Sequence, residues 1–514
     1  MSMKEKYESL QLVDLKAIAK ARGLKGTSTM KKDEIIKVML DEDEKDLQKG
    51  KEIEVKSLAS APAPKKAPAA KASSTKEHES KASSSKTNDA KASAQKASSQ
   101  KANDSKAPDT KKNAPNSSEE NKPKNPSEVY DANNFPQELD SGISARGILE
   151  VMPDGYGFIR CENFLPGEND VYVAPSQIRK FGLKTGDFLI GNTRVKTQTE
   201  KFAALLYIKS INGYTPEESS RRANFEDMTP IFPDERIKLE RPGCSVAMRI
   251  MDLISPVGKG QRGMIVSQPK AGKTTLLKEV AKSVKMNNPN THLIILLIDE
   301  RPEEVTDIKE AIQGPNVEVI YSTFDELPEH HKRVSEMVIE RGRRLVEHHQ
   351  DVMILIDSIT RLTRAYNLTV APSGRTLSGG LDPAALHMPK RFFGAARNMR
   401  EGGSLTILAT ALVETGSKMD DVVYEEFKGT GNMELVLDRK LSEKRVFPAI
   451  DIPKSGTRRE DLLLDEDELE AINIIRKAMN GLKPDEAVDH ILDMFSRTKN
   501  NMDFVNVVKK TKWL

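Results

Sequence analysis

The chain has 514 residues, more than one hydrophobic core usually holds, so several domains are expected. Lys and Arg number 80 against 77 Asp and Glu, and the resulting net charge of +3 excludes any argument for nucleic-acid binding from overall charge. Cys161 and Cys244 fit neither a disulfide framework nor a zinc pattern, and no run of 18 apolar residues occurs, so a soluble, cytoplasmic protein without a membrane contact is expected.

Residues 1–49 are expected to form a small helical module. Leucine and isoleucine recur at helical spacing before Gly23, and a second apolar run starts at Ile35. The basic residues of this segment permit contact with a nucleic acid. A solvated surface explains them equally well.

Residues 50–140 are rich in Lys, Ala, Ser and Pro and almost free of aromatic residues. Lysine recurs at every fifth residue from Lys71 to Lys106, and a five-residue step turns about 140° on a helix, so the lysines form no stripe. This composition predicts a disordered linker. Two roles stay open: a solubilising tether, and non-specific attraction to RNA phosphates that weakens with salt.

Residues 141–212 predict a small β-barrel of the oligonucleotide-binding (OB), cold-shock-like kind, because about five short strands alternate with turns. Tyr156 and Phe158 are spaced to share one face of a strand, and Tyr172 and Phe202 come from other strands. Aromatic side chains on one barrel face can stack on unpaired bases. The alternative is that two of these rings belong to the barrel core.

Polar residues of the same segment could complete an RNA site. Arg160 and Lys201 could contact phosphates. Hydrogen bonds from base edges could be accepted by three carboxylates, those of Asp154, Asp170 and Glu200.

Residues 213–240 form a polar connector, and residues 241–514 alternate apolar strands with helical stretches such as Lys273–Met286 and His331–His349. This alternation predicts a parallel sheet covered on both faces, with ligands at the carboxyl ends of its strands. The expected strands are Met264–Val266, Leu293–Ile298, Val317–Tyr321, Val352–Ile356 and Leu405–Ala409.

The segment Arg262–Thr275 reads RGMIVSQPKAGKTT and predicts a strand, a tight loop and the start of a helix. Backbone N–H groups and the positive end of the helix dipole would then bind phosphates, with Lys273 reaching the β- and γ-phosphates and Thr274 holding Mg²⁺. Ser267 replaces the first glycine of the usual motif. An ordinary strand–turn–helix with a surface lysine is the alternative. The predicted phosphate loop comprises Pro269, Lys270, Ala271, Gly272, Lys273, Thr274 and Thr275.

Two apolar strands end in carboxylates that suit phosphoryl transfer to water. Asp357 closes one strand and would serve Mg²⁺, and Glu300 closes another and would orient the attacking water. The alternative for Glu300 is an acidic residue at a helix start before Pro302. Arg445 and Arg458 lie in later loops, where they could stabilise phosphate charge or form surface salt bridges.

Five long motifs resemble the bacterial transcription termination factor Rho family, over residues 8–40 and 143–510. The resemblance implies a homohexameric ring of RecA-type P-loop ATPase domains that binds ATP and Mg²⁺. It also implies 5′→3′ translocation along single-stranded nascent RNA, as a helicase that releases transcripts, with RNA polymerase and elongation factors as partners. The motifs are Asp299–Thr306, Ile354–Asn367, Pro389–Asn398, Glu414–Leu435 and Lys444–Asp451.

The resemblance also implies individual roles near the nucleotide. Lys270 would lie near the γ-phosphate, Arg301 would gate the site and Arg361 would lie close by. Arg458 would be the finger supplied by a neighbouring subunit, Arg445 would also reach across, and Phe447 would stack on adenine.

For RNA, the resemblance implies a primary site and two loops in the central pore. Arg375, in the loop Pro372–Gly380, stands where the family usually has Lys. The other loop is Gly416–Met419, in which Lys418 would grip phosphate. Phe202 stands where the family often has Tyr, which removes a hydroxyl and keeps the stacking surface. The implied primary site comprises Tyr156, Phe158, Arg160, Asp170, Tyr172, Glu200 and Phe202.

Two rival functions remain at this stage. A rotary proton-ATPase subunit shares the core, but aromatic residues on a barrel face argue against it. A passive RNA-binding protein dominated by its lysine-rich segment is opposed by intact Lys273, Glu300 and Asp357. The histidine pairs 330–331 and 348–349 are expected at the surface or at helix ends, not in a metal site.

Overall fold

The computed structural model describes Ala19 and residues 30–40, 137–479 and 484–511. The chain divides into two compact units, Met1–Glu119 and Glu120–Leu514. In the first unit, residues 32–40 are helical, and Ile35, Ile36 and Met39 are buried with Ala19. The second apolar run of the expected N-terminal module is therefore a helix. Most of the predicted linker at residues 50–140 lies outside the described residues.

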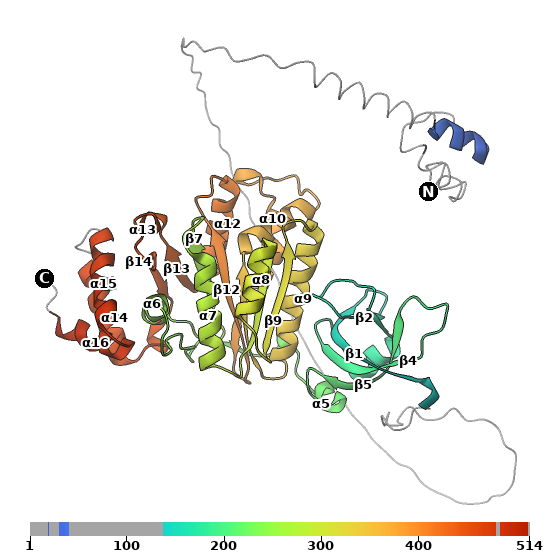
Figure 1. Ribbon diagram of the computed structural model, residues 1–514, viewed down its shortest axis with the longest axis horizontal. Coiled ribbons are helices and arrows are strands. Elements are labelled where there is room, and N and C mark those ends of the chain that lie inside the picture. The colour runs from blue at the N-terminus through green and yellow to red at the C-terminus, as the bar shows by residue number, and fades with distance from the viewer. Residues whose placement is uncertain (1–18, 20–29, 41–136, 480–483, 512–514) are drawn as a thin grey trace, which may run out of the picture. The chain divides into compact units, whose positions relative to one another are not determined.

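The second unit begins with a closed barrel in the strand order β1-β2-β3-β5-β4 (Figure 1). β3 and β5 are parallel and the other paired strands are antiparallel. Closure brings backbones together at Gly147 and Gly191, where a Cβ would lie 2.3 Å and 2.2 Å from a carbonyl oxygen of the facing strand. The predicted OB-type barrel is thus confirmed. Its elements are β1 (Asp140–Val151), β2 (Gly157–Arg160), β3 (Val171–Val173), α4 (Pro175–Phe181), β4 (Phe188–Arg194) and β5 (Ala203–Ile211), preceded by η1 (Gln137–Leu139).

A connector of short elements links the barrel to the large sheet. Thr215 caps the first of them, because its side chain accepts a hydrogen bond from the backbone N–H of Glu218. The connector contains α5 (Pro216–Ser220), η2 (Phe225–Asp227) and β6 (Pro230–Ile231).

The large sheet has the strand order β14-β13-β7-β12-β10-β8-β9, with β11 and β6 added at the start of β12. All neighbours along this order are parallel except β13 and β14. The five predicted strands are all present and run to or beyond their predicted ends. The strands are β7 (Arg262–Ser267), β8 (His292–Glu300), β9 (Val317–Thr323), β10 (Asp351–Asp357), β11 (Arg397–Met399), β12 (Ser404–Leu412), β13 (Met433–Leu437) and β14 (Ile450–Thr457).

Helices cover both faces of this sheet, because successive residues of each strand enter two different cores. In β8, Leu293 and Ile295 pack with one set of helices, whereas Ile294 and Leu296 pack with the other. The first set is α6 (Val246–Ile254), α7 (Lys273–Asn287), α8 (Pro302–Ala311), α14 (Glu466–Met479), α15 (Pro484–Arg497) and α16 (Asn501–Lys510). The second set is α9 (Pro328–Val346), α10 (Ile359–Thr369), α11 (His387–Gly394) and α12 (Lys418–Lys428).

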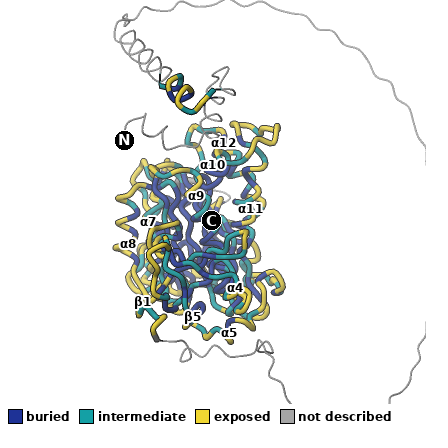
Figure 2. The backbone as a smooth tube through the Cα atoms, turned by 90° about the vertical axis from the view of Figure 1, so that its right-hand side faces the viewer, coloured by how far each residue is buried: buried dark blue, intermediate teal, exposed yellow. Residues whose placement is uncertain are grey.

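The smaller remaining elements are α13 (Arg439–Glu443), η3 (Ser378–Gly380), η4 (Pro383–Leu386) and η5 (Glu460–Leu462). Buried residues run through the centre of the sheet region, and exposed residues lie at its periphery (Figure 2). Within the described ranges, no helix has both the length and the apolar character needed to cross a bilayer.

Candidate nucleotide and RNA sites

The predicted phosphate loop lies between the carboxyl end of β7 and the first turn of α7. Gly272 is the N-cap of α7 with φ of 93°, a left-handed conformation that favours glycine. Lys270 also has a positive φ, 67°. The loop therefore presents the amino end of α7, where unpaired N–H groups and the helix dipole favour an anion.

The Lys273 ammonium joins the carboxylates of two other motifs. Its Nζ lies 2.9 Å from Glu300 Oε1 and 2.5 Å from Asp357 Oδ1. Burial opposes the charge of Lys273, but the nearby Asp357 and Glu300 carboxylates outweigh burial and raise the pKa of the ammonium group. Three residues predicted from separate segments thus meet at the carboxyl ends of β8 and β10.

Glu300 is held in its ionised form. Only 3% of the residue is exposed, and burial alone would raise the pKa of its carboxyl group, yet the charges of Lys273 and Arg361 hold that pKa below its ordinary value. Arg361 Nη1 lies 3.0 Å from Glu300 Oε2 and also donates to the carbonyl oxygen of Asp299. Arg361 of α10 therefore orients a carboxylate that is able to accept a proton.

Asp357 and Thr274 fit a magnesium site. Asp357 Oδ1 accepts hydrogen bonds from Lys273 and, at 2.8 Å, from the Thr410 hydroxyl, whereas its buried Oδ2 has no partner among the described residues. A buried carboxylate oxygen left free of donors, together with the Thr274 hydroxyl beside Lys273, is the oxygen donor set that Mg²⁺ prefers. The Thr274 hydroxyl lies 3.3 Å from Glu304 Oε2.

Thr410 and Glu304 were not found from the sequence. Thr410 is a polar residue in the apolar strand β12, and it follows Ala409, which pairs with Ile356 next to Asp357. This polar residue was the only feature of the sequence that could have indicated a contact with Asp357.

The other predicted nucleotide residues surround this cluster or lie away from it. Ser442 donates a hydrogen bond to the Lys270 carbonyl oxygen at 3.3 Å, which places the segment carrying Arg445 and Phe447 against the phosphate loop. Phe447 is 57% exposed. Arg301 is also exposed and has Glu304 at 4.0 Å as its ion-pair partner.

Arg458 lies at the opposite end of β7. Thr457 pairs with Met433, which pairs with Gly263 near the amino end of β7, whereas Lys273 follows the carboxyl end. Between Gly263 and Ser267 there is roughly 13 Å of strand at the usual rise per residue, which an arginine side chain does not span. One chain therefore does not bring Arg458 to its own Lys273.

Four aromatic rings gather on the barrel surface. The ring centroids of Phe158 and Phe202 lie 5.1 Å apart, those of Tyr156 and Phe158 5.8 Å, and those of Phe158 and Tyr172 6.0 Å. All four rings are partly exposed and lie outside the barrel core, so the alternative that two of them are core residues is wrong. Tyr156 precedes β2 instead of lying within it. We call these rings the aromatic platform.

The charged residues expected beside the platform are largely engaged with one another. Arg160 is 6% exposed and forms ion pairs with Glu150 and Asp170, and Asp170 is 2% exposed. The expectations that Arg160 contacts phosphates and that Asp170 contacts a base edge are therefore corrected, because both side chains are buried against each other. Glu200 is paired with Arg194. Exposed Asp154 and Lys201 remain open to solvent, and the Lys201 ammonium lies 5.1 Å from the Phe202 ring.

The two predicted pore loops lie against each other. A Cβ added to Gly379 would lie 2.4 Å from the backbone nitrogen of Met419, so the loop that carries Arg375 packs directly on the start of α12 at Lys418. Both cations are exposed, and neither forms an ion pair with another of the described residues.

The histidines are less exposed than expected. His331 is 6% exposed and lies 2.7 Å from Ser322 Oγ, and half-buried His348 stacks on Tyr214 with ring centroids 4.4 Å apart. Neither is a fully exposed surface residue, but both lie at an end of α9, as the alternative helix-end position predicted. His330 and His349 are exposed. No group of three potential metal-binding side chains of the His, Cys, Asp and Glu types exists within the described part of the chain. Both cysteines are free thiols.

The phosphate loop, the paired carboxylates and the sheet topology define a P-loop ATPase, here carrying an OB-type barrel. Comparison with known sequences shows which family of P-loop ATPases the chain resembles. Residues 145–217 match the RNA-binding domain of Rho termination factor, residues 6–42 match its N-terminal domain, and residues 247–457 match the nucleotide-binding domain of the ATP synthase alpha/beta family.

Full-length relatives agree with these matches. The chain is 55% identical to transcription termination factor Rho of Pseudomonas aeruginosa, over 72% of this chain and 88% of the relative. It is 55% identical to Rho of Bacillus subtilis (73% and 86% covered) and 53% identical to Rho of Aquifex aeolicus (71% and 85% covered). The chain belongs to the transcription termination factor Rho family.

Proposed function

We propose that this protein is an ATP-dependent RNA translocase and helicase that moves 5′→3′ and releases nascent RNA from RNA polymerase. The observation that carries the proposal is the convergence of Lys273, Glu300 and Asp357 in a chain that also bears an aromatic platform for unpaired bases. One site can hydrolyse a nucleotide, and the other can hold the polymer that the hydrolysis moves. The proposed divisions of the chain are residues 1–49, 50–140, 141–212, 213–240 and 241–514, and the proposed location is the cytoplasm.

In this proposal, Lys273 leaves the two carboxylates to contact the β- and γ-phosphates, and Glu300 accepts a proton from the attacking water while Arg361 holds it in place. Mg²⁺, held by Thr274 and Asp357, would neutralise phosphate charge. Lys270 contacts the γ-phosphate, Arg301 gates the site and Phe447 stacks on adenine.

A homohexameric ring is proposed because a single chain does not bring the expected arginine finger, Arg458, to its own nucleotide site. Arg458 lies near the amino end of β7 and Lys273 lies beyond its carboxyl end, so a neighbouring subunit must supply Arg458, with Arg445 also reaching across. Arg375 and Lys418 then face the centre of the ring and grip the RNA backbone, while Tyr156, Phe158, Tyr172 and Phe202 hold the incoming bases.

The test is ATP hydrolysis with and without polycytidylate, on the full-length protein and on a variant lacking residues 50–140. We expect stimulation by RNA in both, with a modest, salt-sensitive loss of RNA affinity in the shortened variant. Equal hydrolysis rates with and without RNA would overturn the proposal. Light scattering during chromatography with nucleotide is expected to give a hexamer, and a monomer under all nucleotide conditions would be an equally adverse result.

A further inference from the structure

The underside of the aromatic platform is held by a buried ion pair. The Arg160 guanidinium lies 5.0 Å from the centre of the Phe158 ring and is paired with Asp170 on the same barrel. Its other side contacts Glu150 of β1, with Nη2 2.6 Å from Glu150 Oε2. Arg160 therefore contacts a ring of the platform and is itself held by two carboxylates.

Glu150 extends this arrangement out of the barrel. Arg333 Nη2, on helix α9 of the ATPase core, lies 2.7 Å from both carboxylate oxygens of Glu150. Within the barrel, Asp170, Arg160 and Glu150 carry one uncompensated negative charge, and Arg333 neutralises it. The four residues form an alternating row of charges that ends on α9, and we call it the platform relay.

The same face of α9 continues to the hydrolysis site. Glu336, one turn after Arg333, accepts a hydrogen bond at 2.9 Å from the hydroxyl of Tyr366 on α10. Tyr366 is 6% exposed, and burial together with Glu336 raises the pKa of its phenol, so the hydroxyl remains a donor. α10 also carries Arg361, which contacts Glu300. Side-chain contacts, joined by one stretch of α9 and one stretch of α10, thus connect Phe158 to Glu300.

We propose that Glu150 and Arg333 are positioning residues that couple base stacking on the platform to hydrolysis at Glu300. When a base stacks on Phe158, the ring and the Arg160 beneath it lose freedom, and Glu150 transmits that restriction to Arg333. α9 and α10 then hold Arg361 in the arrangement that orients Glu300. This inference rests on the proposed function, because it assigns the residues through which RNA stimulates the ATPase.

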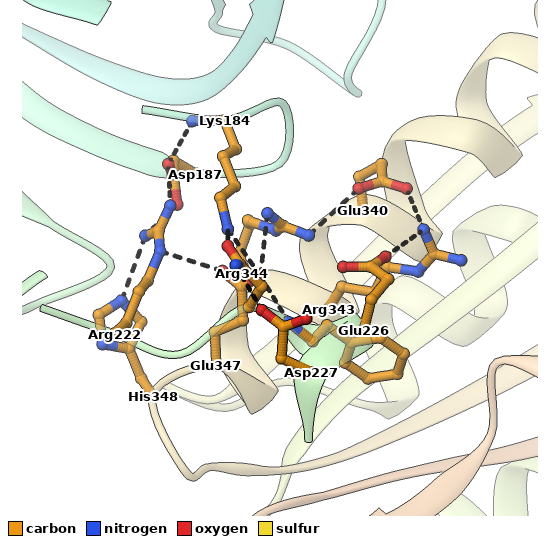
Figure 3. A network of polar contacts seen from close by, with 12 residues as sticks. Lys184, Asp187, Arg222, Glu226, Asp227, Glu340, Arg343, Arg344, Glu347 and His348 are labelled. Carbon is orange, nitrogen blue, oxygen red and sulfur yellow. Dashed lines mark hydrogen bonds and ion pairs between the residues drawn. The ribbon is translucent and has the colours of Figure 1, made fainter. Parts of the chain in front are cut away.

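A second ion-pair cluster between the barrel and α9 provides a matched control. Lys184 of the barrel lies 3.0 Å from Glu347, which also pairs with Arg222 of the connector (Figure 3). In the part of the chain that the structure describes, no ion pair or cation–π contact joins this cluster to the four rings. Removing Lys184 therefore weakens the docking of the barrel without cutting the platform relay.

The experiment compares Glu150→Gln, Arg333→Met, Arg333→Lys and Lys184→Met in the full-length protein. Binding of a labelled oligocytidylate is measured by fluorescence anisotropy without ATP, and hydrolysis is measured with and without RNA. We expect Glu150→Gln and Arg333→Met to keep the oligocytidylate Kd and the basal rate within about threefold, while RNA stimulation falls about tenfold, inside the usual range of allosteric coupling. Arg333→Lys retains the charge and should retain more than half of the stimulation.

The double variant Glu150→Gln with Arg333→Met should be no worse than either single variant, because both cut one path. Unchanged stimulation in the single variants would overturn the inference, and so would an equal loss in Lys184→Met, which would indicate general loosening of the barrel. A parallel rise in Kd would make Glu150 an RNA-binding residue instead. If the unaltered protein shows no stimulation, the proposed function itself fails. If the unaltered protein and the variants are stimulated equally, only the platform relay fails.

Discussion

The Lys273 ammonium lies 2.9 Å from the Glu300 carboxylate, so the lysine proposed to bind phosphates and the carboxylate proposed to orient water neutralise each other in this arrangement. Asp357 shares the same ammonium at 2.5 Å. Phosphates that draw Lys273 away would leave Glu300 with Arg361 as its remaining cation. In the proposed mechanism, nucleotide binding and activation of Glu300 are therefore linked through one side chain.

Replacing Glu300 by Gln keeps its shape and removes its basicity. We expect the RNA-stimulated rate to fall by about 10²–10⁴-fold, the usual contribution of a general base, while ATP affinity changes little. Steady-state hydrolysis and binding of a fluorescent ATP analogue measure the two quantities. Glu303→Gln, in the exposed first turn of α8, is the control and should retain normal turnover. Normal turnover in Glu300→Gln would remove Glu300 from its assigned role.

Thr410→Val removes the hydroxyl that donates to Asp357 at 2.8 Å and leaves the side-chain volume unchanged. Asp357 should then hold Mg²⁺ in a less defined orientation, and we expect the Mg²⁺ concentration for half-maximal hydrolysis to rise about tenfold, the scale of one outer hydrogen bond to a ligand. A Mg²⁺ titration of the ATPase rate measures this.

Thr406→Val provides the matched control on the same strand. The Thr406 hydroxyl is equally buried and accepts from the backbone N–H of Gly260 at 2.9 Å, away from the nucleotide. Each substitution should cost about 1–3 kcal/mol of stability. If both variants shift the Mg²⁺ requirement equally, Thr410 acts only through stability.

Phe158→Ala removes the ring that contacts the other three rings of the platform. Loss of one stacked base is worth about 1–3 kcal/mol, so affinity for single-stranded RNA should fall about 5- to 150-fold with ATP affinity unchanged. Phe158→Tyr retains the stacking surface and should bind normally. Phe181→Leu, at the end of α4 and outside the platform, is the barrel control. Undiminished RNA binding by Phe158→Ala would contradict the assignment.

Stability should fall as the pH drops from 6.5 towards 4, in part through His348. Burial, with the Arg222 charge beside the ring, lowers the pKa of His348 to about 4. Below about pH 6.5 the unfolded chain therefore binds a proton at His348 that the folded chain does not bind, and this favours unfolding. Asp187, His349 and Arg341 also face this ring. The loss amounts to roughly 3 kcal/mol at most, and solvent around the half-buried ring reduces it.

Thermal unfolding measured between pH 8 and pH 4 tests the contribution of His348. His348→Gln should show a shallower fall of the unfolding midpoint over that range than the unaltered protein, whereas His349→Gln, at an exposed neighbour, should not. Identical pH profiles in all three proteins would show that the proton is taken up elsewhere.

The large sheet could be predicted because its strands are buried on both faces. Val352–Ile356 is apolar at every position, since alternate residues face helices on opposite sides. Lys273, Glu300 and Asp357 were predictable for a related reason: parallel strands bring their carboxyl ends together, so residues just past each strand must meet.

The charged contacts could not be predicted, because their partners come from remote segments. Arg160 looks like a phosphate ligand beside Phe158 until Glu150 and Asp170 are seen around it. Arg333 lies on a helix with many charges, and nothing in its spacing indicates a barrel residue as its partner. Helix α9 ends at Val346, so the predicted stretch to His349 was too long. Just past that end, His348 stacks on Tyr214, a contact with a remote segment that the sequence does not indicate.

Gly379 limits how the sequences of two loops, the one after α10 and the one before α12, can vary. Its backbone occupies the space that any β-carbon would need beside Met419, so no other amino acid fits there without separating the loops. Residues 371–376 are exposed, so we expect changes of length in that stretch to leave this contact undisturbed. Such changes would alter the exposed part of the loop and leave its contact with Met419 in place.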